Sequence, residues 1–389
     1  MDKNKLVFTT LFPYIENIHI VKDVGMIPYA MKKYYGYDSN IVIYKNRAYP
    51  YLDNDLNNIN YNYYPYKLKK HNKLLNCRKY LKKNAKNIDI LHLYHVGNKI
   101  TWLCIYKYLK INKKGLIYIH MDENSKFISD DILGLNKNTI KSILKKRLLK
   151  KYIFTDENRK KILYGLQNIT NIDIYKKQFP FDNMDYIPNG FEKFDDNKKT
   201  KKENIILFVG RIGSPEKRTD ILLEGYKKAY SKIKNWKLKL VGPISDEFKE
   251  YLNNFIEENK ELSKNIEFTG PIYDRKKLYD EYKKATVFCL TSDYESFGLV
   301  TLEALGNGCT ILSSDIDASI EIINGGEFGE IFKNGDINDF RDKLIDICNN
   351  QELQNHVLKE YNKYVNDKYS YDKLLKPLDK WIKEMRKNL

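Results

Sequence analysis

Short runs of apolar residues alternate along the chain with segments whose apolar residues recur at helical spacing. The short runs predict buried strands, and segments such as 219–230 ("TDILLEGYKKAY") and 139–152 ("TIKSILKKRLLKKY") predict amphipathic helices. Nearly continuous apolar strands between helices are typical of parallel sheets covered on both faces, so we predict an α/β fold. The expected strands are 5–12, 39–45, 88–94, 115–121, 151–156, 185–190, 204–211, 236–243, 265–270, 285–292 and 308–315.

A polar segment divides this pattern into two blocks. Residues 191–204 ("FEKFDDNKKTKKEN") contain almost no aliphatic side chains, which is typical of an interdomain linker. We therefore expect two doubly wound domains that face each other across a cleft, with ligands at the carboxyl ends of their strands. The predicted parts are a first domain at 1–190, a linker at 191–203, a second domain at 204–368, and a terminal helix at 369–389 that is interrupted near Pro377 and packs back on the first domain.

Charge is distributed unevenly between the two halves of the 389-residue chain, whose net charge is +17. Residues 1–190 contain 34 Lys and Arg against 16 Asp and Glu, whereas the remaining residues contain 34 against 35. A basic half indicates an anionic partner, which could be a lipid surface, a phosphorylated acceptor or nucleic acid. The alternative is a lysine-rich surface that serves solubility alone.

The sequence also bears on the compartment. Its start lacks the apolar core and cleavage site of a signal peptide, and no stretch reaches the roughly 18 apolar residues of a membrane span. The five cysteines are scattered and form no CxxC pair, which favours reduced thiols over a disulfide framework or a zinc site. We therefore expect a cytoplasmic protein.

Residues 292–309 ("SDYESFGLVTLEALGNGC") place Glu295 and Glu303 eight positions apart. On one continuous helix they would point about 80° apart and lie about 12 Å apart along the axis, so a loop followed by a helix is the better interpretation. The first turn of that helix, at about 298–301, would leave backbone N–H groups unpaired and able to bind a phosphate. Gly298 would let a ligand approach the backbone, Glu295 could bind sugar hydroxyls, and Glu303 could hold a ribose.

A second motif, "LFVGRIGSPEKRTD" (207–220), places Arg211 at the end of a strand and Lys217 just before the next helix. Two cations at loop ends form a clamp for a diphosphate, because they stabilise the charge of the leaving group. The combination of this motif with the glutamate pair predicts a nucleotide-sugar site more strongly than either motif alone.

These two motifs, with "IEFTGPI" between them, resemble the C-terminal half of glycosyltransferase family 4, whose members have the GT-B fold of two Rossmann-like domains and an E-x7-E signature. The match covers about 205–335 closely and extends more loosely to "YIPNGF" (186–191) and "LIYIHMDE" (116–123). The resemblance implies a retaining, metal-independent enzyme without a cofactor, in which the first domain binds the acceptor and the second binds the donor.

The resemblance also implies roles for individual residues. Arg211 and Lys217 would bind the donor diphosphate, Glu295 the donor sugar and Glu303 the ribose, while His120 would reach the reacting sugar from the first domain. The implied catalytic residues are thus His120, Arg211, Lys217 and Glu295. The implied donor site comprises Gly210, Arg211, Lys217, Gly270, Pro271, Ile272, Glu295, Ser296, Phe297, Gly298, Leu299, Val300, Thr301 and Glu303, with Gly270 to Ile272 beside the nucleobase.

Each of these assignments has a less specific alternative. The glutamates could be solvated, Arg211 and Lys217 could be surface cations, and His120 could be a buried structural histidine. His92 and His95 are better explained as structural. The Asp-Asn-Asp at 53–55 could suggest a metal-binding DxD motif, but it lies in an Asn-rich stretch without a preceding apolar strand, so we expect a loop there and no metal site.

The sequence therefore predicts a hexosyltransferase that uses a nucleotide sugar, with a UDP-sugar as the expected donor and a glycan or lipid-linked acceptor in cell-surface polysaccharide or glycoconjugate biosynthesis. Peripheral contact with an anionic membrane at its cytoplasmic face is expected through the basic segments 139–152 and 66–83 ("YKLKKHNKLLNCRKYLKK"). A nucleotide-sugar epimerase or hydrolase of the same fold is the main alternative. Nucleic acid is not an expected partner, because the lysines are spread out and no recognised binding module is present.

Overall fold

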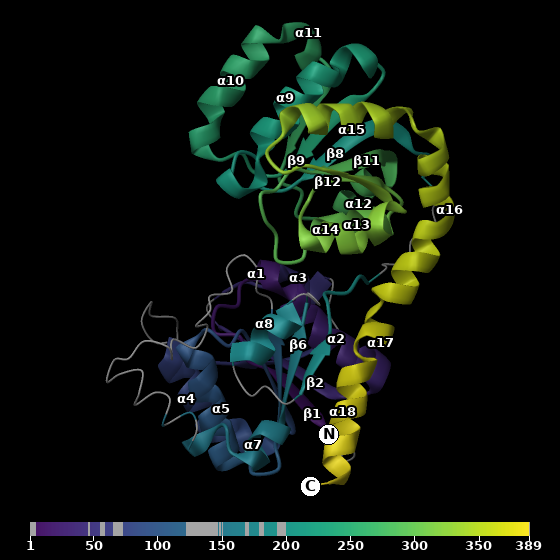
Figure 1. The fold of residues 1–389 in the computed structure, drawn as a ribbon. Coiled ribbons are helices and arrows are strands. Elements are labelled where there is room, and N and C mark those ends of the chain that lie inside the picture. The colour runs from purple at the N-terminus through teal and green to yellow at the C-terminus, as the bar shows by residue number, and fades with distance from the viewer. Residues whose placement is uncertain are drawn as a thin grey trace. The chain divides into compact units, whose positions relative to one another are not determined.

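The computed structural model describes residues 5–45, 47–54, 59–64, 73–121, 147, 149, 151–167, 171–178, 183–192 and 200–388. The chain forms two compact units, and the first is discontinuous in sequence. Unit 1 consists of Met1–Gly190 together with Tyr371–Leu389, and unit 2 consists of Phe191–Ser370. Each unit contains one parallel sheet flanked by helices (Figure 1).

The sheet of unit 1 has seven parallel strands in the order β3-β2-β1-β4-β5-β6-β7. The strands are β1 (Val7–Thr10), β2 (Asp38–Ile43), β3 (Asn60–Tyr63), β4 (Ile90–Tyr94), β5 (Leu116–Met121), β6 (Ile162–Leu166) and β7 (Met184–Tyr186). The described helices are α1 (Asn17–Ile20), α2 (Asp23–Tyr35), α3 (Pro50–Asn54), α4 (Lys73–Asn84), α5 (Lys99–Ile111), α7 (Asp156–Lys160), α8 (Asn171–Gln178), α17 (Tyr371–Leu374) and α18 (Lys376–Lys387).

The sheet of unit 2 has six parallel strands in the order β10-β9-β8-β11-β12-β13. They are β8 (Glu203–Val209), β9 (Lys237–Val241), β10 (Ile266–Gly270), β11 (Ala285–Leu290), β12 (Thr310–Ser314) and β13 (Gly329–Phe332). The helices are α9 (Thr219–Ala229), α10 (Lys249–Glu258), α11 (Lys260–Ser263), α12 (Arg275–Lys284), α13 (Leu299–Gly306), α14 (Asp317–Ile322), α15 (Ile337–Asn349) and α16 (Gln351–Lys368), with a short 3-10 helix at Pro215–Lys217.

Both sheets follow from the apolar runs of their central strands. Every residue of β5 and of β11 is buried, because helices cover both faces of each sheet. Short polar side chains begin several of the helices. Asp274 accepts hydrogen bonds from the first turn of α12, and Asp336 does the same for α15. The α/β fold with parallel sheets, predicted from the hydrophobic pattern, is confirmed.

Some expected elements differ from the structure. The strand expected at 151–156 is wrong: Ile153 and Phe154 are buried in a turn, and Thr155 caps the start of α7. A short apolar run fits a buried turn as well as a strand, so the pattern alone misassigns it. The strands β3, β6 and β13 were not expected. Most of the helix expected at 139–152 lies outside the described residues.

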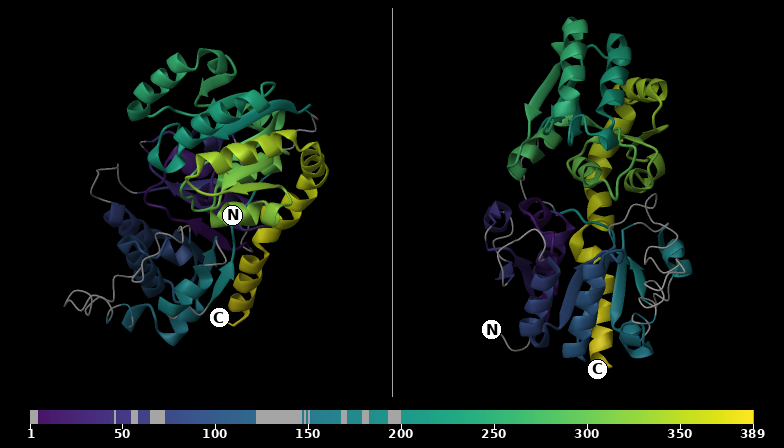
Figure 2. Two further views of the ribbon diagram at one scale, coloured as in Figure 1. Left: turned by 45° about the horizontal axis from the view of Figure 1, so that its top comes forward. Right: turned by 90° about the vertical axis from the view of Figure 1, so that its left-hand side faces the viewer.

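The C-terminal helices α17 and α18 belong to unit 1, where Figure 2 shows them in yellow. Their buried side chains complete the core of that unit. Pro377 lies in the first turn of α18, where a missing N–H costs no helical hydrogen bond. The Tyr37 hydroxyl donates to Asp379 Oδ1 at 2.9 Å. The apolar side chains buried from this segment are Tyr371, Leu375, Leu378 and Ile382. At the start of unit 2, Phe191 N–H donates to the carbonyl of Tyr369 at 2.8 Å, so the first residues of the expected linker are hydrogen-bonded within that unit.

Candidate active site

Two loops at the carboxyl edge of the unit 2 sheet carry most of the expected site. They follow β8 and β11, which are adjacent strands at the centre of the sheet. Asp293 N–H donates to the carbonyl of Glu216 at 2.9 Å, and Thr291 Oγ1 donates to the carbonyl of Lys217 at 2.8 Å. These hydrogen bonds fix the two loops side by side, which explains how residues far apart in sequence share one site.

Lys217 and Glu295 form an ion pair between these loops. The lysine side chain is 13% exposed and the glutamate side chain 17% exposed. Ser292 Oγ also donates to Glu295 Oε1, at 2.7 Å, so the carboxylate is held by groups on both loops. The structure thus brings together two of the residues implicated by the sequence, in a setting where charge is only partly screened by water.

Arg211 follows β8 and has a different environment. Its side chain is 69% exposed and pairs with Glu216, whose carboxylate also accepts a hydrogen bond from Ser214 Oγ at 3.0 Å. Partial burial opposes ionisation of Glu216, but hydrogen bonds from its own backbone, from Arg211 and from Ser214 lower its pKa overall. Arg211 and Lys217 are therefore held by two separate carboxylates.

Helix α13 begins after Gly298, which has the left-handed backbone conformation at φ 74°. Glycine is favoured here because residues with a side chain rarely adopt this backbone conformation. Crowding is not the reason, since the nearest atom to an added Cβ would be 3.5 Å away. In the described part of the chain, the N–H groups of Leu299 and Val300 have no backbone hydrogen-bond partner. The expectation of a free N–H at Thr301 is wrong, because it donates to the Gly298 carbonyl at 2.8 Å and so tightens the first turn.

The neighbouring residues of the expected donor site are also placed by this turn. Ser296 is half-buried, and the ring of Phe297 is buried against Tyr369 at 6.2 Å between ring centroids. Phe297 could therefore offer a ligand its backbone rather than its side chain. The Thr301 side chain is buried, and its Oγ1 has no hydrogen-bond partner.

Glu303 lies on α13 and is turned toward α12. The Tyr282 hydroxyl donates to Glu303 Oε2 at 3.2 Å, and Arg275 lies 3.7 Å from Oε1. Burial, followed by the charge of Glu303, raises the pKa of Tyr282. The Glu303 side chain is 18% exposed, so it is anchored from the protein side while part of its surface remains accessible.

Glycines allow the strand ends beside β8 to approach closely. A Cβ on Gly242 would lie 1.8 Å from the carbonyl oxygen of Gly210, and Gly242 N–H donates to the carbonyl of Gly270 at 3.1 Å. Gly270 itself has φ 71° and is followed by the exposed Pro271 and the half-buried Ile272. The structure therefore places Gly210 and Gly270 to Ile272 at the same sheet edge as Lys217.

Arg218 and Gly242 were missed at the level of sequence. Arg218 has φ 46°, an unusual conformation for a residue with a side chain, and its guanidinium pairs with Asp220 at 2.9 Å and Asp293 at 3.2 Å. The pair with Asp293 is a further link between the loops after β8 and β11. The basic run "EKR" gave no signal that its last member, rather than a glycine, would adopt this conformation.

His120 lies in unit 1, on the central strand β5, and is fully buried. Its Nδ1 donates to the Tyr118 hydroxyl at 2.9 Å, Gln167 Nε2 donates to its Nε2 at 3.0 Å, and Asn189 Oδ1 lies 3.4 Å from Nε2. Asp23 Oδ2 is 3.7 Å away. Burial lowers the pKa of His120 to about 3, and the effect is opposed by Asn189 Oδ1, which could accept a hydrogen bond from the protonated ring. The ring is therefore neutral, and its accessible surface is closed by these neighbours.

The other histidines of this region have structural environments. His92 is buried and hydrogen-bonds through Nδ1 to Thr10 Oγ1 at 2.9 Å, and burial followed by the proximity of His120 lowers its pKa. His95 has φ 55° and donates its N–H to the carbonyl of His120 at 3.1 Å. These contacts support the strand ends around His120.

The structure also bears on the metal and membrane expectations. The loop expected at 53–55 is wrong for its first two residues, because α3 extends to Asn54, and Asp55 lies outside the described residues. Among the described residues, no group of three or more His, Cys, Asp or Glu is arranged to hold a metal ion. Within the same part of the chain, no helix has the length and apolar character needed to cross a bilayer.

Known proteins with similar sequences carry out glycosyl transfer. Residues 190–384 match the family described as Glycosyl transferases group 1. A poly(ribitol-phosphate) alpha-N-acetylglucosaminyltransferase of Staphylococcus aureus is 25% identical over 362 residues, which cover 90% of this chain and 68% of that protein. An uncharacterized glycosyltransferase of Haemophilus influenzae is 24% identical over 343 residues, covering 87% of this chain and 89% of that protein.

Solved structures share the fold. A glycosyltransferase from Rickettsia africae superimposes with a TM-score of 0.72 at 18% identity, covering 99% of this chain and 100% of that one. S. aureus TarM, solved with Fondaparinux, alpha-GlcNAc-glycerol and UDP, superimposes with a TM-score of 0.57 at 22% identity, covering 80% of this chain. The present chain spans 59% of the TarM chain. The family match, the two parallel sheets and the similar solved structures together show that this chain belongs to the group 1 glycosyl transferases and is an enzyme of the GT-B fold.

Proposed function

We propose that the protein is a retaining hexosyltransferase of family 4 that transfers a sugar from a UDP-sugar to a glycan or lipid-linked acceptor during polysaccharide or glycoconjugate biosynthesis. The observation that carries the proposal is the ion pair of Lys217 with Glu295 at the carboxyl ends of adjacent strands, beside the unpaired N–H groups that begin α13. The matched relative of S. aureus that acts on poly(ribitol-phosphate), and the UDP bound in TarM, support the acceptor and donor classes.

The donor diphosphate would take the place that Glu295 and Glu216 now hold beside the two cations. Lys217 and Arg211 would then stabilise the negative charge that develops as the bond between C1 of the sugar and the phosphate oxygen breaks. The acceptor hydroxyl would attack C1 from the same face, and its proton would pass to the departing phosphate oxygen. The released Glu295 carboxylate could bind hydroxyls of the donor sugar, while Glu303 binds the ribose.

This arrangement needs no strong base, because the leaving phosphate accepts the proton. The positive charge comes from two side chains and from the N–H groups of Leu299 and Val300. We therefore expect transfer without a metal ion or another cofactor. Preorganised charge of this kind accounts for a large part of the rate enhancement in many enzymes.

His120 would contribute as a neutral hydrogen-bonding group. Its lowered pKa keeps the imidazole uncharged at physiological pH, which suits contact with a sugar hydroxyl better than general acid catalysis. Because Gln167 and Asn189 now cover Nε2, contact with a substrate requires at least one of these amides to move.

We also propose that unit 1 meets an anionic surface at the cytoplasmic face of the membrane. Unit 1 contains 40 Lys and Arg against 19 Asp and Glu, whereas unit 2 contains 28 against 32. Helices α4 and α5 of unit 1 expose Leu74, Leu75 and Leu103 beside the basic side chains of Arg78 and Lys107. Exposed leucines beside basic side chains are suited to contact with the headgroup region of an anionic bilayer. We do not expect nucleic acid to bind.

A thermal-shift screen against nucleotide sugars tests the proposed donor, because a ligand at 100 times its Kd stabilises a protein by about 2.7 kcal/mol. We expect UDP-sugars to stabilise the enzyme more than other nucleotide sugars. Transfer of a labelled sugar to a glycan or lipid extract, with the anomeric configuration of the product measured by NMR, tests acceptor and stereochemistry. Sugar release at the full rate without acceptor would favour a hydrolase, and an inverted product would refute retention.

A further inference from the structure

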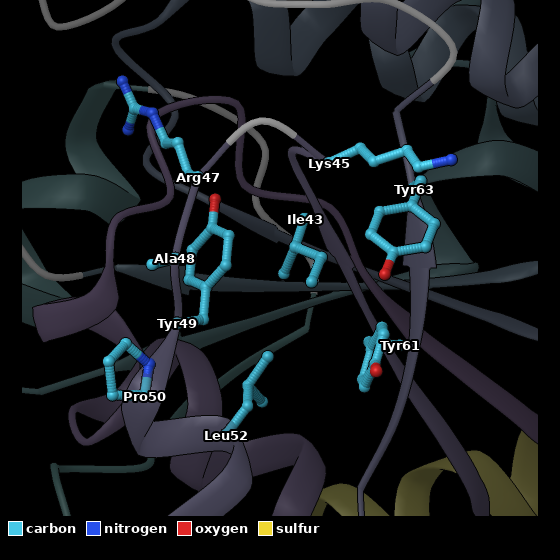
Figure 3. A pocket seen from close by; sticks show the side chains of 9 residues that line it. All are labelled: Ile43, Lys45, Arg47, Ala48, Tyr49, Pro50, Leu52, Tyr61 and Tyr63. Atoms are coloured by element: carbon cyan, nitrogen blue, oxygen red, sulfur yellow. The ribbon is translucent and has the colours of Figure 1, made fainter.

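A pocket of about 390 Å³ lies at the carboxyl ends of β2 and β3 in unit 1. This volume is within the range of about 300–1,000 Å³ that is usual for small-molecule sites. Figure 3 shows two tyrosines of the edge strand on one side of the pocket and the segment that begins α3 on the other, with Ile43 between them. Ligands of parallel α/β sheets bind beyond the carboxyl ends of the strands, near the point where the strand order reverses. The pocket lies at this end of the sheet, beside β2, which is the neighbour of β1 at the β1–β4 reversal.

The outer wall of the pocket is aromatic and exposed. Tyr61 and Tyr63 are each 46% exposed, so a ligand can reach both side chains. They lie two residues apart on β3 and therefore face the same way, with ring centroids 5.7 Å apart. A tyrosine ring offers a flat, electron-rich face to the C–H groups of a sugar ring and a hydroxyl to its polar edge.

The inner wall is already formed without a ligand. Tyr49 and Leu52 are buried, and the Tyr49 hydroxyl accepts a hydrogen bond from Tyr44 N–H at 3.3 Å. The same hydroxyl lies within hydrogen-bond distance of the Ile15 carbonyl, at 3.4 Å. Because these side chains are fixed by the fold, a ligand would meet a preformed surface and would pay little entropy to order it.

Two cations flank the pocket from opposite sides, with Arg47 on the side of Tyr49 and Lys45 on the side of Tyr63 (Figure 3). Arg47 is oriented by its hydrogen bond to the Ile15 carbonyl at 2.9 Å and by Glu16 Oε1 at 3.2 Å. Lys45 is exposed, and it forms no ion pair with a described residue. The described residues that line the pocket include no carboxylate, and Glu16 pairs with Arg47 from outside the lining, so Lys45 supplies the positive charge that would favour an anion.

We propose that this pocket is an acceptor subsite for an anionic glycan segment, in which the tyrosines contact a sugar or polyol and Lys45, on the side of Tyr63, binds a neighbouring phosphate or carboxylate. The proposal rests on the proposed function, because it names the acceptor class of the transferase. A single-stranded oligonucleotide is the other ligand that aromatic rings and cations could bind. The position at the strand ends of a glycosyltransferase unit favours the glycan.

Calorimetric titration of the full-length protein tests the proposal with four probes: a glycerol-phosphate oligomer, an oligogalacturonate, a neutral maltooligosaccharide and an oligouridylate. We expect one or both anionic glycans to bind at least tenfold more tightly than the neutral one, and the stronger of the two identifies the anion. Equal binding of charged and neutral glycans, tighter binding of oligouridylate, or no glycan binding would overturn the proposal.

Variants locate the binding to this pocket. Tyr63→Ala and Tyr61→Ala should each weaken glycan binding by about 3- to 10-fold. Lys45→Ala should weaken it by a few-fold at low salt and reduce its salt dependence. The matched controls Tyr34→Ala on α2 and Lys114→Ala before β5 remove another exposed tyrosine and another exposed lysine outside the pocket and should have no effect. Circular dichroism checks folding, and glycan affinities unchanged in all three pocket variants would contradict the proposal.

UDP binding to the same variants separates this inference from the proposed function. Pocket variants should raise the KM for acceptor and leave UDP affinity unchanged. Glycan binding without any UDP binding would retain the pocket and refute the transferase proposal. UDP-sugar transfer with an unchanged acceptor KM in the pocket variants would support the transferase proposal and refute the acceptor subsite.

Discussion

Lys217 and Glu295 form an ion pair although they lie 78 residues apart in the sequence. The pair connects the loops after β8 and β11, and both side chains are largely buried. A carboxylate in such a position stays paired with the cation until an anion that binds the cation more tightly displaces it. In the proposed mechanism, the donor diphosphate displaces this internal carboxylate from Lys217.

We expect Lys217→Ala to lower kcat/KM for the donor by about 2–4 kcal/mol, which corresponds to roughly 30- to 1,000-fold, because it removes a preorganised charge. Arg211→Ala should fall at the lower end of this range, since its side chain is 69% exposed and better screened. Steady-state kinetics with a UDP-sugar measures both effects. Lys249→Ala, which removes an exposed lysine on α10, serves as the control. Turnover close to wild type in both site variants would refute the clamp.

Gly298→Ala should destabilise unit 2 by about 1–2 kcal/mol, because a side chain is disfavoured at φ 74°. Gly325 offers a matched control: its φ is 66°, and an added Cβ would meet no atom within 4 Å. Gly325→Ala should therefore cause a similar loss of thermal stability without changing UDP affinity. Gly298→Ala should also weaken UDP binding, and equal UDP affinities in the two variants would argue against a ligand at the start of α13.

His120 and His92 should stay neutral across physiological pH. Their pKa values are lowered by burial, that of His120 to about 3, so selectively labelled imidazoles should show no titration between about pH 5 and 8 by NMR. Resonances missing from His120→Gln and His92→Gln assign the signals. A midpoint near 6.5 for His120 would contradict its enclosed environment.

The same lowered pKa values predict how stability depends on pH. Below about 6.5 the unfolded chain binds protons that the folded chain does not, so unit 1 should lose stability as the pH falls from about 6.5 toward 3. Each buried histidine contributes a slope of up to about 1.4 kcal/mol per pH unit. Melting temperatures of the wild type and of His120→Gln over this range should show a shallower acid dependence in the variant.

Liposome flotation tests the proposed membrane contact. We expect binding to anionic vesicles at low salt that falls at high salt, because each nearby Lys or Arg contributes up to about 1 kcal/mol. Arg78→Glu with Lys107→Glu should reduce recovery, and Leu75→Asp should reduce it further, whereas Lys249→Glu in unit 2 should not. Equal recovery on neutral and anionic vesicles, or no binding at all, would leave the charge of unit 1 as a solubility feature.

Most strands of both sheets were predictable from the sequence, including the edge strands β7 and β10, whereas the edge strands β3 and β13 and the inner strand β6 were not. Strands such as β5 and β11 are buried on both faces and appear as continuous apolar runs. The edge strand β3, "NYNY", is exposed at all four residues and carries no aliphatic side chain, so hydrophobicity gives no signal. The turn at Ile153 and Phe154 shows the opposite error, a strand predicted where none exists. Its residues are apolar and buried but do not pair in the sheet.

The candidate site shows the same division. Arg211, Lys217, Glu295 and Glu303 were expected from their motifs, because motif spacing and strand ends are visible in sequence. The contacts that join the two loops were not expected. The ion pair of Arg218 with Asp293, for example, depends on a tertiary contact that the sequence does not reveal. The enclosure of His120 by Gln167 and Asn189 was equally invisible, because those residues lie 47 and 69 positions away in the chain.

The discontinuity of unit 1 has a consequence for how the protein is made. A ribosome synthesises residues 191–370 in one stretch, so unit 2 can complete its core while unit 1 still lacks Leu375, Leu378 and Ile382. Unit 1 is therefore begun before unit 2 but completed after it, and its apolar core remains incomplete while unit 2 is synthesised. Chains that stop near residue 370 would contain all of unit 2 but would lack the apolar side chains that complete the core of unit 1, so we expect such chains to aggregate.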